Sequence, residues 1–161
     1  MSQITYTPIG IIHTPFKTQS ETPIQGIFSP DSIGEVELYP QYFEGLKDIS
    51  DFSYIILIYY FHLSQGYTLI KKPFLDNTEK GIFSIRHYDR PNPIGISVVR
   101  LNEVKENRLS ISEVDIVDGT PLLDIKPYSP RFDSYPKVRA GWQDKISGLT
   151  NTKADDRFEN V

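Results

Sequence analysis

The amino-acid sequence predicts a mainly β fold, a single antiparallel β-barrel-like domain with one or more short peripheral helices. Val, Ile, Tyr, Phe and Thr dominate several short stretches that Gly and Pro bound, as is typical of strands. Consecutive strands of this length with few helices between them favour an antiparallel barrel or a strongly curved sheet. We expect residues 1–142 to form this domain and residues 143–161 to form a polar tail or a short helix.

Seven apolar stretches predict the strands of this domain. In chain order they span residues 4–12, 34–39, 52–62, 81–85, 94–106, 108–117 and 121–125. The fifth stretch has the period of two expected of a half-buried strand, with Ile94, Ile96 and Val98 alternating with Gly95, Ser97 and Val99.

A hairpin turn is predicted at residues 106–108, between two of these strands. In the returning strand, Leu109 and Ile111 share one face, but Val114 and Ile116 fall on the opposite parity. A bulge near residues 112–113 would bring both pairs into the core.

One helix is predicted from Pro40 to about Ile49. Proline is acceptable in the first turn of a helix, and apolar residues then recur at helical spacing up to Leu46 and Ile49. We expect this apolar stripe to cap the barrel or sheet.

Composition indicates a globular protein with one sizeable core. Hydrophobic residues make up 39% and charged residues 24% of the 161 residues, and such a chain buries about 68–70% of its unfolded surface. The longest apolar run, residues 54–61, is too short to span a bilayer. No basic leader precedes Ile4, and there are no cysteines to form disulfides, so we expect a cytoplasmic location.

Several common chemistries lack their motifs. The sequence holds no Gly-rich dinucleotide or phosphate loop and no nucleophile elbow. Without cysteines, and with three histidines far apart at His13, His62 and His87, it offers no metal-ligand spacing. We therefore expect no metal site.

Three proline-flanked turns, residues 90–95, 118–121 and 124–128, contain a dense set of polar side chains. Proline fixes the backbone and removes a donor, so the strands that feed these turns must stop or bend there. Ordinary turn chemistry would explain any one of them alone. Their close succession favours a functional site.

These turns, together with Ile9-Gly10, Thr14-Pro15-Phe16, residues 23–26 and Phe61-His62, resemble the TrmO family, also described as TsaA-like or YaeB-like. Members are tRNA methyltransferases that use S-adenosylmethionine. The resemblance runs through most of residues 5–142, and its most specific segments are residues 90–95 and 117–128.

The resemblance implies an all-β, barrel-like methyltransferase that acts as a homodimer without a metal. It implies methylation of N6 of threonylcarbamoyladenosine, next to the anticodon of tRNA. The positions that it implies for contact with S-adenosylmethionine are Pro23, Ile24, Gln25, His62, Leu63, Arg86, Ile96, Asp115, Ile116, Val117 and Asp118.

Two departures from the family pattern are visible. Bacterial members commonly read Phe-Ala-Thr-Arg-Ser before the Arg-Pro-Asn-Pro turn, whereas residues 83–89 here read Phe-Ser-Ile-Arg-His-Tyr-Asp. Arg86 is kept, so we expect cofactor binding to tolerate this change better than substrate choice does. Because the sequence ends at Val161, we also expect the C-terminal domain of longer bacterial members to be absent.

Candidate roles follow from the chemistry of the cofactor and the acceptor. We expect Arg86 to pair with the methionyl carboxylate, and Asp115 or Asp118 to accept from the ammonium or a ribose hydroxyl. Asp118 is the predicted group that orients or deprotonates the acceptor N–H. The residues that would place the base are Asn92, Lys126 and Tyr128, and those that would line the tRNA approach are Arg90, Lys126, Arg131, Lys137 and Arg139.

Each role has a simpler alternative. Arg86 would serve equally in a surface ion pair, Asp118 in an Asx turn, Asn92 as a loop cap and Tyr128 in the core. At the level of function, the alternatives are a non-catalytic module that binds S-adenosylmethionine or a nucleotide, and a structural protein whose turns only stiffen the barrel rim.

Overall fold

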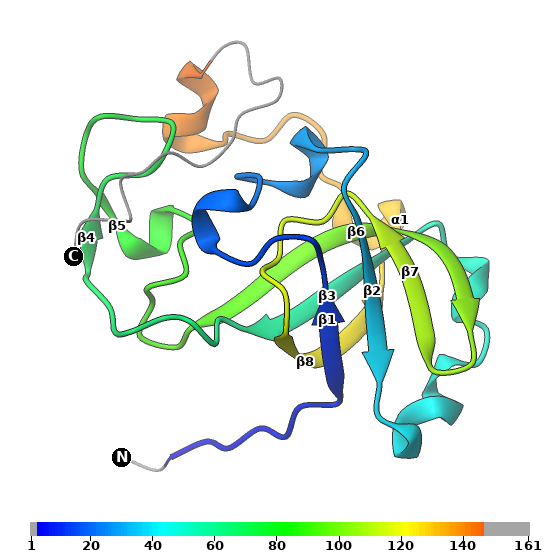
Figure 1. Ribbon diagram of the computed structural model, residues 1–161. Helices are drawn as coiled ribbons and strands as arrows, with labels where there is room; N and C mark the ends of the chain where they lie inside the picture. The colour runs from blue at the N-terminus through cyan, green and yellow to red at the C-terminus, as the bar shows by residue number, and fades with distance from the viewer. Residues whose placement is uncertain (1–2, 147–161) are drawn as a thin grey trace.

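In a computed structural model that describes residues 3–146, six antiparallel strands close into a barrel (Figure 1). These strands are β1 (Gly10–His13), β2 (Ile33–Leu38), β3 (Tyr54–Tyr60), β6 (Ile94–Lys105), β7 (Arg108–Ser112) and β8 (Thr120–Pro127). Around the barrel they follow the order β1-β2-β7-β6-β3-β8, and β8 pairs with β1 to close it. A separate two-stranded sheet joins β4 (Ile70–Lys71) and β5 (Lys80–Gly81). The predicted mainly β, antiparallel barrel is confirmed.

Alternate side chains of the strands fill the barrel, because successive residues of a strand point to opposite faces. Complete burial of such a side chain stabilises the fold by about 1.5–3 kcal/mol. The apolar residues with no exposed surface are Ile12, Val36, Ile55, Leu57, Val99, Leu109, Ile111, Val114 and Leu122.

The helices of the described chain are short. The 3-10 helices are Gln19–Glu21, Gly26–Phe28, Pro40–Leu46, Ile49–Asp51, Ile82–Ser84 and Gly141–Lys145, and the α-helix is α1 (Pro130–Asp133). None of the helices among residues 3–146 is long and apolar enough to cross a membrane.

The single helix predicted at residues 40–49 is instead two 3-10 helices. Asp48 lies between them with φ of 65°, a left-handed conformation that no helix continues through. The apolar stripe still packs as predicted, because Leu46 joins the barrel core and Ile49 packs against it.

Several predicted strands were longer than the observed ones. The stretch 4–12 pairs only from Gly10, and the stretch 81–85 forms the short β5 and then a 3-10 helix. The stretch 108–117 ends as a strand at Ser112. Strand length depends on a partner strand, and residues 4–8 have none in the barrel.

The parity change after the hairpin is real, although its geometry differs from the predicted bulge. Pairing shifts between Leu101 and Glu103 of β6, while Glu113 follows the end of β7 with φ of 62°. Val114 and Ile116 are consequently buried, as are Leu109 and Ile111.

Strand β6 turns its larger side chains outward. Ile94, Ile96 and Val98 are 42%, 52% and 42% exposed, whereas the alternate residues Gly95, Ser97 and Val99 are buried. Glycine is required at position 95 because a Cβ there would overlap the Tyr59 ring. The predicted period of two is confirmed, and it leaves an apolar strip on the outer surface of the barrel.

Two long connections leave the barrel from its strand ends. Residues 14–32 link β1 to β2, and residues 61–93 link β3 to β6 and carry the β4–β5 sheet (Figure 1). These connections, rather than the barrel interior, provide most of the walls of the cavity described next.

Candidate active site

A cavity of about 330 Å³ lies where the two long connections meet the barrel. Its volume is at the small end of the range for small-molecule sites. Its walls come mainly from residues 19–25, 59–63, 83–90, 94–96 and 115–120. Aromatic and aliphatic side chains dominate these walls, and a few polar groups converge on them.

One wall rests on a chain of hydrogen bonds that begins inside the barrel. The Tyr59 hydroxyl lies 3.0 Å from Ser97 Oγ, and Ser97 Oγ donates to Asp115 Oδ1 over 2.5 Å. The other oxygen of Asp115 accepts the Gly26 N–H over 3.1 Å. Asp115 therefore ties the residue 19–25 wall to strand β6.

Burial raises the pKa of Asp115, and the Ser97 hydrogen bond, the Gly26 N–H and Arg86 each oppose that rise. Burial, and then the Asp115 charge, raise the pKa of Tyr59. Tyr59 therefore stays protonated and acts as a donor to Ser97.

Arg86 closes a second side of the cavity. Its Nη1 donates to Gln25 Oε1 over 2.9 Å and so joins two cavity walls that are 61 residues apart in the chain. Arg86 itself is exposed, and its charge acts on Asp115. The cavity thus holds one positive and one acidic side chain close together.

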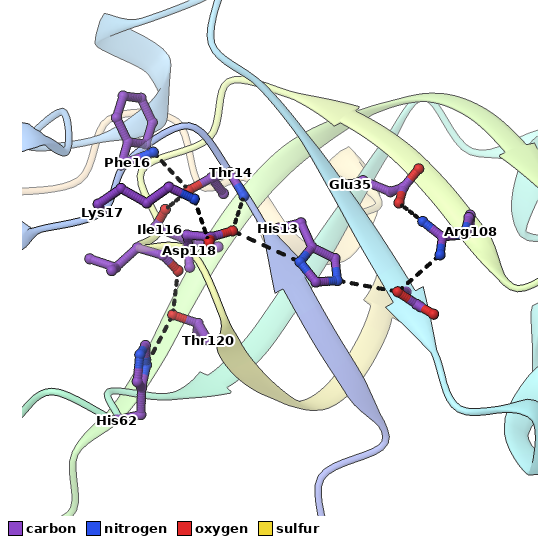
Figure 2. Close-up of polar contacts among 12 residues, drawn as sticks. His13, Thr14, Phe16, Lys17, Glu35, His62, Arg108, Ile116, Asp118 and Thr120 are labelled. Carbon is purple, nitrogen blue, oxygen red and sulfur yellow. Dashed lines mark hydrogen bonds and ion pairs between the residues drawn. The ribbon is translucent and has the colours of Figure 1, made fainter.

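His62 and Thr120 form a third polar group at the end of β3. His62 Nδ1 lies 3.3 Å from Thr120 Oγ1, which donates to the Val117 carbonyl over 2.6 Å (Figure 2). Burial lowers the pKa of His62, and the charge of Asp118 partly offsets this.

A second cavity of about 270 Å³ adjoins the first. The residues that line both are Ile24, Gln25, Phe74, Ile85, Arg86 and His87. Its remaining walls include Phe28 and Trp142, and the Trp142 Nε1 donates to the Ser84 carbonyl over 2.8 Å. Within residues 3–146, no three His, Asp or Glu side chains gather as metal ligands.

Comparison with known families decides what kind of barrel this is. A family model described as the tRNA-methyltransferase O N-terminal domain matches residues 11–134. The chain belongs to the TrmO family.

Two named proteins are similar in sequence to this chain. A probable S-adenosyl-L-methionine-binding protein of Pyrococcus abyssi is 53% identical over 156 residues, which cover 96% of this chain and 85% of the relative. The tRNA (adenine(37)-N6)-methyltransferase of Escherichia coli K12 is 34% identical over 152 residues, which cover 88% of this chain and 65% of the relative.

A solved structure shows the same fold. The crystal structure of TrmO from Pseudomonas aeruginosa superposes with a TM-score of 0.76 at 35% identity, covering 89% of this chain and 63% of that one. The chain therefore spans less than two thirds of the length of both the Escherichia coli relative and this structure.

Ten of the eleven positions that the TrmO resemblance implies for cofactor contact line the 330 Å³ cavity. They come from five separate segments, and they are Pro23, Ile24, Gln25, His62, Leu63, Arg86, Ile96, Asp115, Ile116 and Val117. Their contact with a cofactor stays a prediction, but the fold brings them together.

Asp118 is the one position of that set that does not line the cavity. Its Oδ2 lies 2.6 Å from Lys17 Nζ, and its Oδ1 accepts the Thr14 N–H over 3.0 Å (Figure 2). The bond from Lys17 and then that from Thr14 lower the pKa of Asp118. These partners lie more than 100 residues away in the chain, unlike the local backbone partner of an Asx turn, and the carboxylate fastens the turn to the end of β1.

The other predicted catalytic residues lie outside the cavity of a single chain. Asn92 is exposed in its turn, next to Pro93, whose carbonyl accepts the Phe61 N–H over 2.8 Å. Lys126 pairs with Ile56, and the Tyr128 N–H donates to the Tyr54 carbonyl, so both lie at the end of β3 opposite to His62. Within one chain these residues do not line the cavity, and the roles predicted for Asn92, Lys126 and Tyr128 stay predictions.

Arg90 contacts the backbone behind the cavity wall, and its predicted place on the tRNA approach stays a prediction. Its Nη1 donates to the carbonyls of Ile82 and Ile85, over 3.1 Å and 2.7 Å, and so holds the 3-10 helix behind the cavity wall. The sequence reading also missed several cavity residues. They are Tyr59, Phe61, Phe74, Phe83, Tyr88 and Thr120.

Proposed function

We propose that this protein binds S-adenosylmethionine in the 330 Å³ cavity and transfers its methyl group to N6 of threonylcarbamoyladenosine, next to the anticodon of tRNA. One observation supports this most directly: in a chain of the TrmO family, ten family-implied cofactor positions from distant segments line one cavity. The name of the Escherichia coli relative, a tRNA (adenine(37)-N6)-methyltransferase, supports the choice of acceptor.

The chemistry of the cavity suits S-adenosylmethionine, which carries a carboxylate, an ammonium and a sulfonium beside an adenosine. Arg86 and Asp115 both line the cavity. In this proposal Arg86 pairs with the carboxylate, and Asp115 accepts from the ammonium or a ribose hydroxyl. Tyr59 and Phe61 add aromatic surface, which suits both a purine and a cationic sulfur. When bound, the cofactor supplies a methyl group already activated for displacement.

The rest of the reaction depends on alignment. Methyl transfer is an in-line displacement, so the walls contribute mainly by holding the acceptor nitrogen against the methyl carbon. The adjoining 270 Å³ cavity offers room for an acceptor base next to the cofactor, since six residues line both spaces. Its aromatic walls, Phe28 and Trp142 among them, suit stacking on a purine.

We propose further that the protein acts as a homodimer that packs through the outer face of β3 and β6. Ile94 and Ile96 belong both to this exposed apolar strip and to the cavity wall, so a second copy packed there would abut the site. The predicted roles of Lys126 and Tyr128 in placing the base require such a copy, because they lie far from the cavity of their own chain.

The tRNA is proposed to approach along residues 126–142, which run from the far end of β8 to the second cavity. Arg131, Lys137 and Arg139 are exposed on this segment. Their combined removal should flatten the salt dependence of tRNA binding, because each phosphate contact releases counterions. The location we propose is cytoplasmic.

The experiment is mass spectrometry of tRNA nucleosides after incubation with methyl-labelled S-adenosylmethionine. Two tRNA pools, with and without threonylcarbamoyladenosine, are compared. We expect label in methylated threonylcarbamoyladenosine from the first pool and none in the second.

A second function is favoured by one finding: the Pyrococcus abyssi relative is named only as a probable S-adenosyl-L-methionine-binding protein. Calorimetric binding of the cofactor, with no label in either tRNA pool, would support such a binding module and contradict the methyltransferase. Absence of cofactor binding would contradict both and leave a structural role for the barrel.

A further inference from the structure

We infer that His62 is the proton acceptor of the methyl-transfer step, and that Thr120 positions it by holding its ring in the form that leaves Nε2 unprotonated. This inference rests on the proposed function, since it concerns how the acceptor N6 loses its proton. It concerns a residue that the family resemblance implies only as a cofactor contact.

The hydrogen bonds of Thr120 fix the ring form. A hydroxyl has one proton, and Thr120 Oγ1 donates it to the Val117 carbonyl over 2.6 Å, where the carbonyl oxygen can only accept. Toward His62 the same oxygen can therefore only accept. His62 Nδ1, 3.3 Å away, must then carry the ring proton, and Nε2 keeps its lone pair.

The fold prevents this arrangement from reversing. Thr120 is 3% exposed, so water does not compete for its hydroxyl, and Val117 is only three residues away in the same tight turn. His62 lies two residues beyond the end of β3, and Thr120 is the first residue of β8, which pairs with β3. The barrel thus sets the position of both residues, as Figure 2 shows.

Nε2 is available to a substrate. His62 lines the 330 Å³ cavity, and no side chain or backbone group of residues 3–146 forms a hydrogen bond with Nε2. Burial lowers the pKa of His62, so the ring is neutral at physiological pH and can accept a proton. The titratable side chains that share the cavity wall are Tyr59, Arg86, His87, Tyr88, Arg90 and Asp115.

Asp118, the base predicted from the sequence, fits the task less well. Its carboxylate is held by Lys17 and by the Thr14 N–H, it does not line the cavity, and its pKa is lowered. General bases work best when their pKa lies near the working pH. The charge of Asp118 instead favours the protonated form of His62 and so stabilises the imidazolium that forms.

Methyl transfer moves one methyl group from sulfur to N6 and one proton from N6 to His62. The N6 lone pair forms a bond to the methyl carbon while the carbon–sulfur bond breaks and its electron pair stays on sulfur, which gives a neutral thioether. The N6 proton passes to His62 Nε2, and the resulting imidazolium later returns it to water. No oxidant, reductant or further reactant is needed.

Nitrogen NMR of the intact protein tests the ring form without any activity. The chain has three histidines, and a His62→Asn variant identifies the signals of His62 in two-bond proton–nitrogen spectra of labelled protein. Above the ordinary histidine pKa of about 6.5, we expect the Nδ1–H form. Thr120→Val should shift the ring toward the Nε2–H form, whereas Thr120→Ser should keep it. An Nε2–H ring in the unaltered protein overturns the inference.

Single-turnover methyl transfer at saturating cofactor tests the role itself. In His62→Asn the amide nitrogen can still donate to Thr120, but no proton acceptor replaces Nε2. We expect the rate to fall by about 10²- to 10⁴-fold. In Thr120→Val we expect the rate to fall to the extent that the ring shifts to the Nε2–H form. His13→Asn, a histidine outside the cavity, is the control and should transfer at the parental rate.

The outcomes separate the two proposals. Parental rates in His62→Asn overturn the base assignment and leave the proposed function intact. An unaltered protein that methylates no tRNA overturns the proposed function, while the NMR spectrum still decides which ring nitrogen carries the proton.

Discussion

Ser97 donates a 2.5 Å hydrogen bond to Asp115, and this bond joins the barrel to the wall of the cavity. Because Ser97 gives its only proton to the carboxylate, Tyr59 must donate to Ser97 Oγ, and the three side chains form one directed chain. Asp115 in turn accepts the Gly26 N–H. The position of the residue 19–25 wall is therefore coupled to the barrel core.

Ser97→Ala should destabilise the protein because it removes the middle of this chain. The buried Tyr59 hydroxyl loses its acceptor and Asp115 loses a donor, and an unsatisfied buried polar group costs about 1–3 kcal/mol. We expect a loss of this size in the free energy of unfolding measured by urea titration.

Ser110→Ala is the matched control, on the neighbouring strand β7 and outside the Tyr59–Ser97–Asp115 chain. It should change the free energy of unfolding by no more than about 0.5 kcal/mol. Equal effects of the two variants would show that the hydrogen-bond chain contributes nothing specific.

Gly95→Ala should distort the cavity from the barrel side. A Cβ at position 95 would overlap the Tyr59 ring, which also lines the cavity. Overpacking of this kind costs about 1–3 kcal/mol, and displacement of Tyr59 should also weaken cofactor binding. Both quantities are measurable, by urea titration and by calorimetry. Gly81→Ala, where a Cβ would meet nothing within 4 Å, should leave both unchanged.

Sequence patterns predicted the barrel well because its strands alternate in burial with a period of two. The prediction that the proline-flanked turns form one site fits a single chain less well, and the reason is geometric. Strand β8, Thr120–Pro127, runs through two of these segments, and its eight residues at about 3.3 Å each separate Asp118 from Tyr128. Asp118 and Tyr128 therefore lie at opposite ends of the barrel.

The polar groups of the cavity were predictable only through the family resemblance. His62 and Thr120 are 58 residues apart, and their contact depends on the pairing of β3 with β8 rather than on any local pattern. The same holds for Arg86 and Gln25, which are 61 residues apart. Thr120 itself belongs to a proline-flanked turn, so its position in the sequence was a usable signal.

Arg86→Ala should weaken binding of S-adenosylmethionine. A hydrogen bond to a charged group contributes about 1.5–3 kcal/mol, so we expect the dissociation constant to rise roughly 10- to 150-fold in calorimetry. Arg100→Ala, an exposed arginine farther along β6 that does not line the cavity, is the control. Unchanged affinity in Arg86→Ala would remove Arg86 from the cofactor site.

Asp118→Asn separates a fastening role from a catalytic one. The variant keeps an acceptor for the Thr14 N–H but loses the ion pair with Lys17, which is 67% exposed. Exposed ion pairs contribute about 0–1 kcal/mol, so stability should change little. We expect methyl transfer to slow only slightly, because the variant loses the charge that favours protonated His62 but keeps His62 itself. A fall of about 10²-fold or more, with cofactor affinity kept, would favour Asp118 over His62 as the base.

The stability of the protein should decline between neutral pH and about pH 4 because of His87. Burial, followed by the Lys71 charge, lowers the pKa of His87 to about 4, and its Nδ1 accepts the Asp89 N–H over 3.0 Å. The unfolded chain therefore binds the proton first, near the ordinary histidine pKa of about 6.5. The stabilisation that the neutral His87 ring gives is complete above the unfolded-state pKa. It is lost as the pH falls through the folded-state pKa of His87.

Urea titrations across this range should show a loss on the order of 3 kcal/mol from His87. His87→Gln cannot titrate, so its free energy of unfolding should depend less steeply on pH even if the variant is less stable throughout. A smaller dependence of the free energy of unfolding on pH should persist in that variant, because burial also lowers the pKa of His62. An identical slope in the two proteins would mean that His87 is already protonated in the native state, contrary to its buried place beside the cavity.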